Sequence, residues 1–155
     1  MADANAYPGR PMEMALQAAR EAAARGEVPV GAVVLAADGK LLACAGNQTE
    51  AMHDASAHAE MIAMRMAASQ TGNLRLIGCT LVASLEPCAM CAAAASHFRI
   101  ARLLFGAYDP KGGAVEHGAR LYDRPDCLHR PEWIGGIGET ESAALLRAFF
   151  ELRRG

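Results

Sequence analysis

The sequence predicts an α/β fold in which a mixed β-sheet is covered by helices on both faces. The first observation is a hairpin pattern, because two short apolar segments, residues 30–36 and 40–45, flank the turn signal Asp38-Gly39. The second is the order that follows, in which helical and strand-like segments alternate along the chain. A hairpin followed by alternating strands and helices predicts both antiparallel and parallel strand pairs in one sheet.

The remaining elements follow from apolar spacing and turn residues. Residues 11–25 carry an apolar stripe at helical spacing, and Gly26 ends it at a C-cap position. After the hairpin, residues 46–56 are polar and predicted to form a loop, and residues 57–69 resume a helical composition. Further along we expect a strand at 79–85, a helix at 89–97, a strand at 102–106 and a helix at 140–153.

Length and composition suit one domain with a sizeable core, since the chain has 155 residues and is 52% hydrophobic. We place this domain at residues 11–155, after a polar and flexible N-terminal segment, residues 1–10. No stretch approaches the length of a transmembrane helix and the N-terminus lacks a secretory signal pattern, so we expect a cytoplasmic protein without a membrane partner. Cys44, Cys79 and Cys127 are expected to be small buried thiols rather than disulfides.

Two short motifs contain candidate metal ligands. Cys88 and Cys91 are three residues apart and lie on one face of the predicted helix, and Pro87 suits the first turn of that helix. The positive end of a helix favours thiolates. His58 in the other motif is the candidate third ligand, and two thiolates with an imidazole select zinc over magnesium or calcium. Three protein ligands leave the fourth position for water, so Glu60 is predicted to move protons during hydrolysis at an electrophilic carbon.

The two motifs in this order resemble the H-x-E…P-C-x-x-C signature of zinc nucleobase deaminases. A wider match makes the chain similar to the bacterial tRNA-specific adenosine deaminases of the cytidine/deoxycytidylate deaminase superfamily, over most of residues 12–154. The matching segments are Gly26-Glu27-Val28-Pro29-Val30-Gly31-Ala32-Val33, Asn47, Ala57-His58-Ala59-Glu60-Met61, Leu85-Glu86-Pro87-Cys88-Ala89-Met90-Cys91 and Phe105-Gly106-Ala107-Tyr108-Asp109-Pro110-Lys111.

The resemblance implies a cytidine deaminase-like fold, a three-layer α/β/α sandwich, and hydrolytic deamination of adenosine to inosine at the wobble position of tRNA. It also implies one zinc ion per subunit, a homodimer and an anticodon loop as partner. Among substrate contacts it assigns Asn47 to the purine edge and Val30 and Leu85 to the walls of the base pocket. It places Asp109 in a loop facing the anticodon, and it places on a C-terminal helix beside the RNA cleft Phe149, Phe150 and Arg153.

Simpler interpretations stay open for these substrate residues. Val30 and Leu85 also suit the core, Asp109 suits a turn, and the two phenylalanines suit amphipathic helix packing. A free nucleobase or nucleoside deaminase, of the guanine or cytosine type, would share every catalytic residue, and the net charge of −2 with a pI near 6.2 favours it over an RNA enzyme. A zinc-stabilised binding module without catalysis would need a fourth protein ligand, from Cys79 or His53.

Overall fold

The computed structural model describes residues 10–154, so the N-terminal segment predicted to be flexible, residues 1–10, lies outside the described residues except for Arg10. The described chain forms a five-stranded sheet with the order β2-β1-β3-β4-β5. β1 is antiparallel to both β2 and β3, whereas β3, β4 and β5 are parallel, which confirms the predicted mixed sheet. The strands are β1 (Gly31–Leu35), β2 (Leu41–Gly46), β3 (Thr80–Leu85), β4 (Arg102–Ala107) and β5 (Glu132–Ile134).

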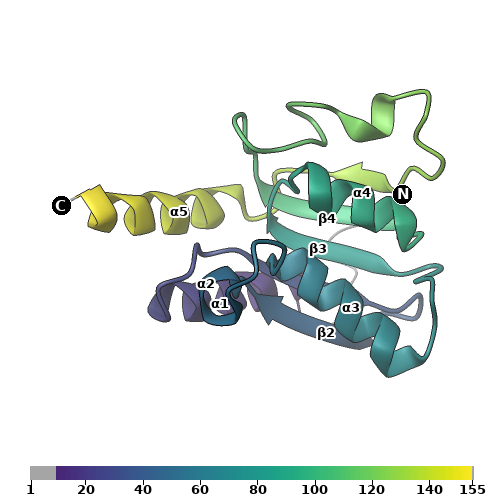
Figure 1. Ribbon diagram of the computed structural model, residues 1–155, viewed down its shortest axis with the longest axis horizontal. Helices are drawn as coiled ribbons and strands as arrows, with labels where there is room; N and C mark the ends of the chain where they lie inside the picture. The colour runs from purple at the N-terminus through teal and green to yellow at the C-terminus, as the bar shows by residue number, and fades with distance from the viewer. Residues whose placement is uncertain (1–9, 155) are drawn as a thin grey trace.

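Helices cover both faces of the sheet, giving the three layers expected of an α/β/α sandwich (Figure 1). Successive side chains of β1 point to opposite faces. Ala32 and Val34 pack in a core with α3 and α4, whereas Val33 and Leu35 pack in a second core with α1. The helices are α1 (Pro11–Ala24) and α5 (Glu139–Arg154) on one face and α3 (Ala59–Thr71) and α4 (Ala89–His97) on the other.

The alanine-rich face of α1 lies unusually close to the hairpin, and two glycines make this possible. A Cβ atom on Gly31 would lie 1.8 Å from the carbonyl oxygen of Ala15. One on Gly46 would lie 2.7 Å from the carbonyl oxygen of Ala18. The helix backbone therefore packs directly on the strand backbone at the end of the hairpin where residues 47–58 leave the sheet.

Two elements differ from the sequence-based expectation. Residues 46–56 were predicted to form a loop, but they contain the single-turn helix α2 (Thr49–Met52). The edge strand β5 was not predicted, because three residues are too few to show a period-2 pattern and its pairing with β4 is a tertiary contact. A 3₁₀ turn, Leu121–Asp123, also lies in the long connection between β4 and β5.

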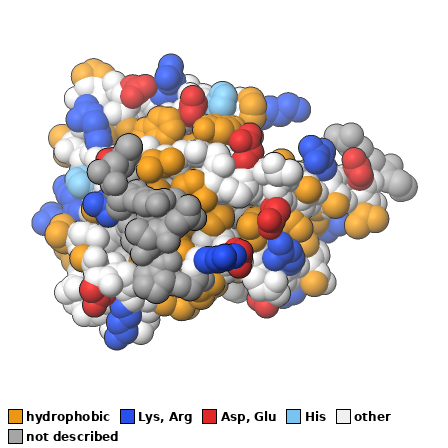
Figure 2. Space-filling view, turned by 180° about the vertical axis from the view of Figure 1, so that it is seen from behind, with side chains coloured by type: hydrophobic (Ala, Val, Ile, Leu, Met, Phe, Trp, Pro, Cys, Tyr) orange, Lys and Arg blue, Asp and Glu red, His pale blue; other side chains and the backbone are white. Residues whose placement is uncertain are grey.

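Charged side chains of both signs are interspersed on the face opposite to that of Figure 1 (Figure 2). Residues 97–130 carry six Lys and Arg against four Asp and Glu. Half of these cations form ion pairs, so the region offers less free positive charge than its composition suggests. The pairs are Arg102–Glu132 at 3.6 Å, Arg120–Asp123 at 3.3 Å and Arg124–Asp126 at 2.9 Å. Within residues 10–154, no helix combines the length and hydropathy that a membrane crossing requires.

Candidate metal centre and active site

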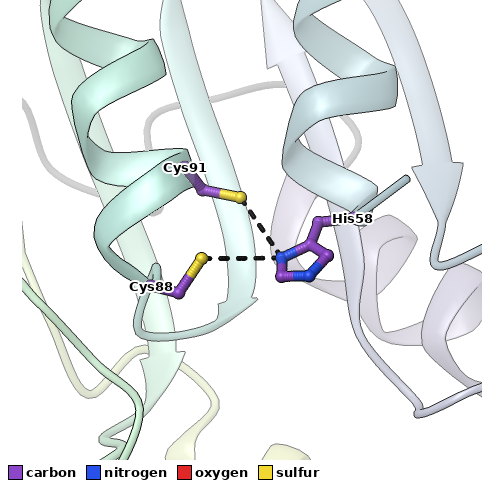
Figure 3. A group of neighbouring side chains, drawn as sticks. All are labelled: His58, Cys88 and Cys91. Carbon is purple, nitrogen blue, oxygen red and sulfur yellow. Dashed lines mark hydrogen bonds between the residues drawn. The ribbon is translucent and has the colours of Figure 1, made fainter. Parts of the chain in front are cut away.

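Three candidate metal ligands converge where α3 and α4 begin (Figure 3). The Nδ1 atom of His58 lies 3.5 Å from the sulfur of Cys88 and 3.5 Å from the sulfur of Cys91. All three ligand atoms lie within 4.8 Å of one another. The structure thus brings together two motifs that lie thirty residues apart in the sequence.

The backbone places two of these ligands at helix N-termini. His58 is the N-cap residue of α3 and Cys88 the N-cap residue of α4, both with extended backbone and neither with a side-chain cap hydrogen bond. Cys91 follows one turn later, on the face of α4 toward His58. Because the N-terminal end of a helix carries partial positive charge, this position stabilises the thiolate form of a cysteine.

The spacing of the donor atoms fits a tetrahedral zinc ion. Zinc–sulfur bonds of about 2.3 Å and zinc–nitrogen bonds of about 2.0–2.1 Å, at tetrahedral angles, place sulfur and nitrogen about 3.6 Å apart. The two sulfur–nitrogen distances here are 3.5 Å. The donor set also matches the preference of zinc for thiolate and imidazole. His58, Cys88 and Cys91 therefore suit one zinc ion.

The two cysteines are electrostatically coupled. A hydrogen bond from the Cys91 thiol lowers the pKa of Cys88 to about 4. The same hydrogen bond, with burial, raises the pKa of Cys91. Zinc binds cysteine as the thiolate, so a divalent ion bound here would displace the protons that the two thiols carry.

Glu60 occupies the first turn of α3, two residues after His58, and is only 4% exposed. Burial raises the pKa of its carboxyl group above the usual range. Among the described residues, its Oε1 atom is the buried side-chain oxygen or nitrogen that lacks a hydrogen-bond partner. Such an atom is expected to contact a group bound in the site, since buried polar atoms are otherwise paired. The arrangement suits a carboxyl that accepts and returns a proton.

Asn47 contacts the residue after His58, and Val30 is hydrogen-bonded to Asn47. The Oδ1 atom of Asn47 accepts a hydrogen bond from the main-chain N–H of Ala59, in the first turn of α3, at 2.7 Å. The main-chain N–H of Asn47 donates to the carbonyl of Val30 at 3.1 Å, and both residues are buried. The amide oxygen of Asn47 is thus engaged in positioning the helix that carries Glu60, which leaves its NH₂ group for another contact. Leu85 is half-buried at the end of β3.

Asp109 has a clear local role. Its Oδ1 atom accepts hydrogen bonds from the main-chain N–H groups of Lys111 at 3.2 Å and Gly112 at 2.9 Å, which is a turn arrangement. The turn interpretation of Asp109 is therefore confirmed. A contact with substrate would have to use its second carboxylate oxygen.

The three C-terminal candidates lie together on α5 but do not line the metal centre. The guanidinium of Arg153 stacks on Phe149 at 3.8 Å from the ring centroid and donates to the carbonyl of Gly26 at 2.8 Å. Phe149 is buried, as the packing interpretation predicts, whereas Phe150 is 45% exposed. A hollow of about 500 Å³ is lined by Gly26, Val28, Thr49, Glu50, Phe149, Phe150 and Arg153.

Two buried glutamates position nearby segments by accepting hydrogen bonds, and neither of them was identified from the sequence. Glu27 accepts hydrogen bonds from the Thr49 hydroxyl and from the main-chain N–H groups of Glu50 and Ala51, so it caps α2. Burial alone would raise its pKa, but these hydrogen bonds outweigh burial and the pKa is lowered.

Glu86 is the second of these glutamates and plays the corresponding part for the loop after β4. It accepts hydrogen bonds from the main chain of that loop between Asp109 and His117. Burial alone would raise the pKa of Glu86 as well, and these hydrogen bonds again lower it. The available signal was an acidic residue directly after an apolar strand pattern, in Leu85-Glu86-Pro87.

The non-catalytic zinc module finds no support in the structure. It needs a fourth protein ligand, and among residues 10–154 neither Cys79 nor His53 belongs to the metal-ligand group. Cys79 directly precedes β3, at the opposite end of that strand from Cys88. Glu60 lies two residues after His58, but it does not belong to the metal-ligand group either.

The region that contains both metal motifs matches a known family. The model of the cytidine and deoxycytidylate deaminase zinc-binding region matches residues 9–107. The chain belongs to this deaminase family. Membership confirms the resemblance that was inferred from the motifs. It also confirms the cytidine deaminase-like fold that this resemblance implies.

Individual members of the deaminase family give closer matches. A tRNA-specific adenosine deaminase of Agrobacterium fabrum strain C58 is 52% identical over 143 residues, 92% of this chain and 93% of the relative. A structure from a study of A-to-I editing by tRNA:A34 deaminases at the wobble position of transfer RNA has a TM-score of 0.86 at 51% identity, over 88% of this chain and 98% of that one. Guanine deaminase of Bacillus subtilis has a TM-score of 0.63 at 26% identity, over 94% and 92%.

Proposed function

We propose that this protein is a tRNA-specific adenosine deaminase, a zinc-dependent hydrolase that converts adenosine to inosine at the wobble position of tRNA. The observation that carries the chemistry is the convergence of His58, Cys88 and Cys91 beside Glu60, a buried carboxyl with an unpaired oxygen. The substrate is inferred from the 52% identity to the Agrobacterium fabrum enzyme over nearly the whole of both chains. Residues 11–155 form a single deaminase domain, and the compartment is the cytoplasm.

His58, Cys88 and Cys91 would hold one zinc ion per subunit. When bound, zinc activates water for attack on C6 of the adenine ring. Glu60 accepts a proton and passes it to N1 of the base, and it later protonates the departing amine. Adenosine and water thereby give inosine and ammonia. The raised pKa of Glu60 suits this exchange, because an acid–base catalyst works best when its pKa lies near the working pH.

Asn47, Val30 and Leu85 form the base pocket. The NH₂ group of Asn47 donates to the purine edge while its oxygen holds the helix that carries Glu60. Val30 and Leu85 supply apolar walls. The hydrogen bond from Ala59 makes Asn47 rigid, so the donor is oriented before the base arrives.

Contacts outside the base pocket select an anticodon loop. Bases in such a loop are already single-stranded, so bringing one to the metal costs less than in a duplex. Asp109 contacts the nucleotides beside the target base, and the C-terminal helix contacts the RNA through the exposed ring of Phe150 and the stacked pair of Arg153 and Phe149. A homodimer provides RNA contacts from both subunits.

Purified protein incubated with an anticodon stem-loop should release ammonia and form inosine in equal amounts. Free guanine, cytosine and adenosine in parallel reactions should give little or no ammonia, because they lack contacts outside the base pocket. Inosine is measured by nuclease digestion and chromatography. Ammonia from guanine or cytosine with none from the stem-loop would assign the protein to the free-base deaminases, a possibility raised by the similarity to guanine deaminase.

A further inference from the structure

Glu86 is a charged side chain that accepts five hydrogen bonds yet has no part in the chemistry described above. It directly precedes Pro87 and is 2% exposed. Its Oε1 atom accepts from the main-chain N–H of Asp109 at 3.0 Å and lies 2.8 Å from Nδ1 of His117. Its Oε2 atom accepts from the main-chain N–H groups of residues in the same loop, Val115 at 3.2 Å, Glu116 at 2.9 Å and His117 at 2.9 Å.

The loop of residues 109–117 is packed onto this carboxylate. A Cβ atom on Gly113 would lie 2.5 Å from Cδ of Glu86, so only glycine lets the loop backbone approach so closely. The loop is also tied to the metal motif by its backbone, since the N–H of Ala114 donates to the carbonyl of Pro87 at 2.9 Å. The loop is therefore hydrogen-bonded to the two residues that directly precede Cys88.

We propose that Glu86 is a positioning residue that holds the 109–117 loop, and with it Asp109, against the residues that directly precede Cys88, so that substrate meets a preformed wall. The inference rests on the proposed function, because that function gives the loop a substrate to contact. A loop ordered in advance binds more tightly than one that must be ordered on binding. Glu86 thus acts on substrate affinity through the loop and touches no reacting atom.

Replacing Glu86 with glutamine tests this role at almost constant side-chain size. A glutamine has one acceptor oxygen, and its NH₂ group would face N–H donors at one of the two oxygen positions whichever way it is turned. In the Glu86→Gln variant, amide hydrogen exchange at residues 115–117 should speed up while zinc content stays at one per chain. KM should rise about tenfold or more with kcat nearly unchanged, because the lost interaction serves binding.

Two other variants separate loop positioning from a general loss of structure. In Gly113→Ala the added methyl group moves the loop away from Glu86, whose carboxylate is unchanged. This variant should reproduce the rise in KM, even if Glu86→Gln does not fold. Glu13→Gln is the control, since it makes the same change at an exposed glutamate in the first turn of α1, on the other face of the sheet. It should leave exchange and KM as in the parent.

Specific outcomes would overturn the proposal. Faster exchange in the loop with an unchanged KM would show that the ordered loop does not serve the substrate. An unchanged KM in Gly113→Ala, together with loss of zinc in Glu86→Gln, would show that Glu86 supports only the metal motif. The kinetics are measured with whichever substrate the parent protein deaminates. If the parent does not deaminate the stem-loop, the proposed function is wrong. The role of Glu86 is then tested with the free base that the parent does deaminate.

Discussion

Glu60→Gln should abolish the formation of inosine while the protein keeps one zinc ion per chain. Glutamine preserves the size of the side chain but can neither accept nor return a proton. General acid–base catalysis by one positioned group contributes about 10²–10⁴-fold, and here the same group serves two proton transfers, so we expect a rate loss at or beyond the upper end of that range. Single-turnover inosine formation, with zinc measured on the same sample, provides the test.

Glu13→Gln is the control variant for Glu60→Gln. Glu13 is an exposed glutamate in the first turn of α1, on the other face of the sheet, and its replacement should leave the rate as in the parent. Loss of zinc from Glu60→Gln would show that Glu60 is a metal ligand, and its assignment as the proton carrier would then be wrong.

Cys91→Ser should lose zinc, activity and much of the thermal stability of the protein. Cys91 is completely buried in the first turn of α4, and a hydroxyl is a poor replacement for a thiolate toward zinc. A ligand present at a thousand times its dissociation constant stabilises the folded state by about 4 kcal/mol. For a chain of this size such a loss lowers Tm by on the order of 10 °C. Metal analysis and thermal unfolding measure both effects.

Cys127→Ser is the matched control for Cys91→Ser. Cys127 is half-buried in the connection before β5 and is not part of the metal-ligand group. Its replacement should change neither zinc content nor activity, and treating the parent with a chelator should reproduce the fall in Tm seen in Cys91→Ser. Zinc bound at full stoichiometry in Cys91→Ser would exclude that cysteine as a ligand.

The sequence predicted those parts of the fold that depend on local patterns. The hairpin, the buried strand before Pro87 and the helices at both metal motifs all have apolar spacing or turn residues that act within a few positions. α2 and β5 were not predicted because they depend on distant partners, namely the carboxylate of Glu27 and the edge of β4. Local propensity carries no information on such contacts.

In the candidate site, too, some features were predicted from local sequence patterns and others were not. His58, Cys88, Cys91 and Glu60 were predicted because metal chemistry imposes a spacing that is visible in the sequence. Asn47 and Asp109 were predicted to contact substrate, and the structure shows that each has a local hydrogen-bonding role that spacing alone did not reveal. The role of Glu86 was missed, because its hydrogen-bond donors come from main-chain groups more than twenty residues away.

Zinc X-ray absorption spectroscopy on the purified protein tests the central claim most directly. Two sulfur atoms at about 2.3 Å, with one imidazole nitrogen and one further light atom at about 2.0–2.1 Å, is the shell expected for His58, Cys88, Cys91 and a water molecule. The same spectrum should be obtained from Glu60→Gln. A shell with a third sulfur or a second imidazole, or a spectrum that changes when Glu60 is replaced, would mean that the protein itself fills the fourth position, and the hydrolytic account would be contradicted.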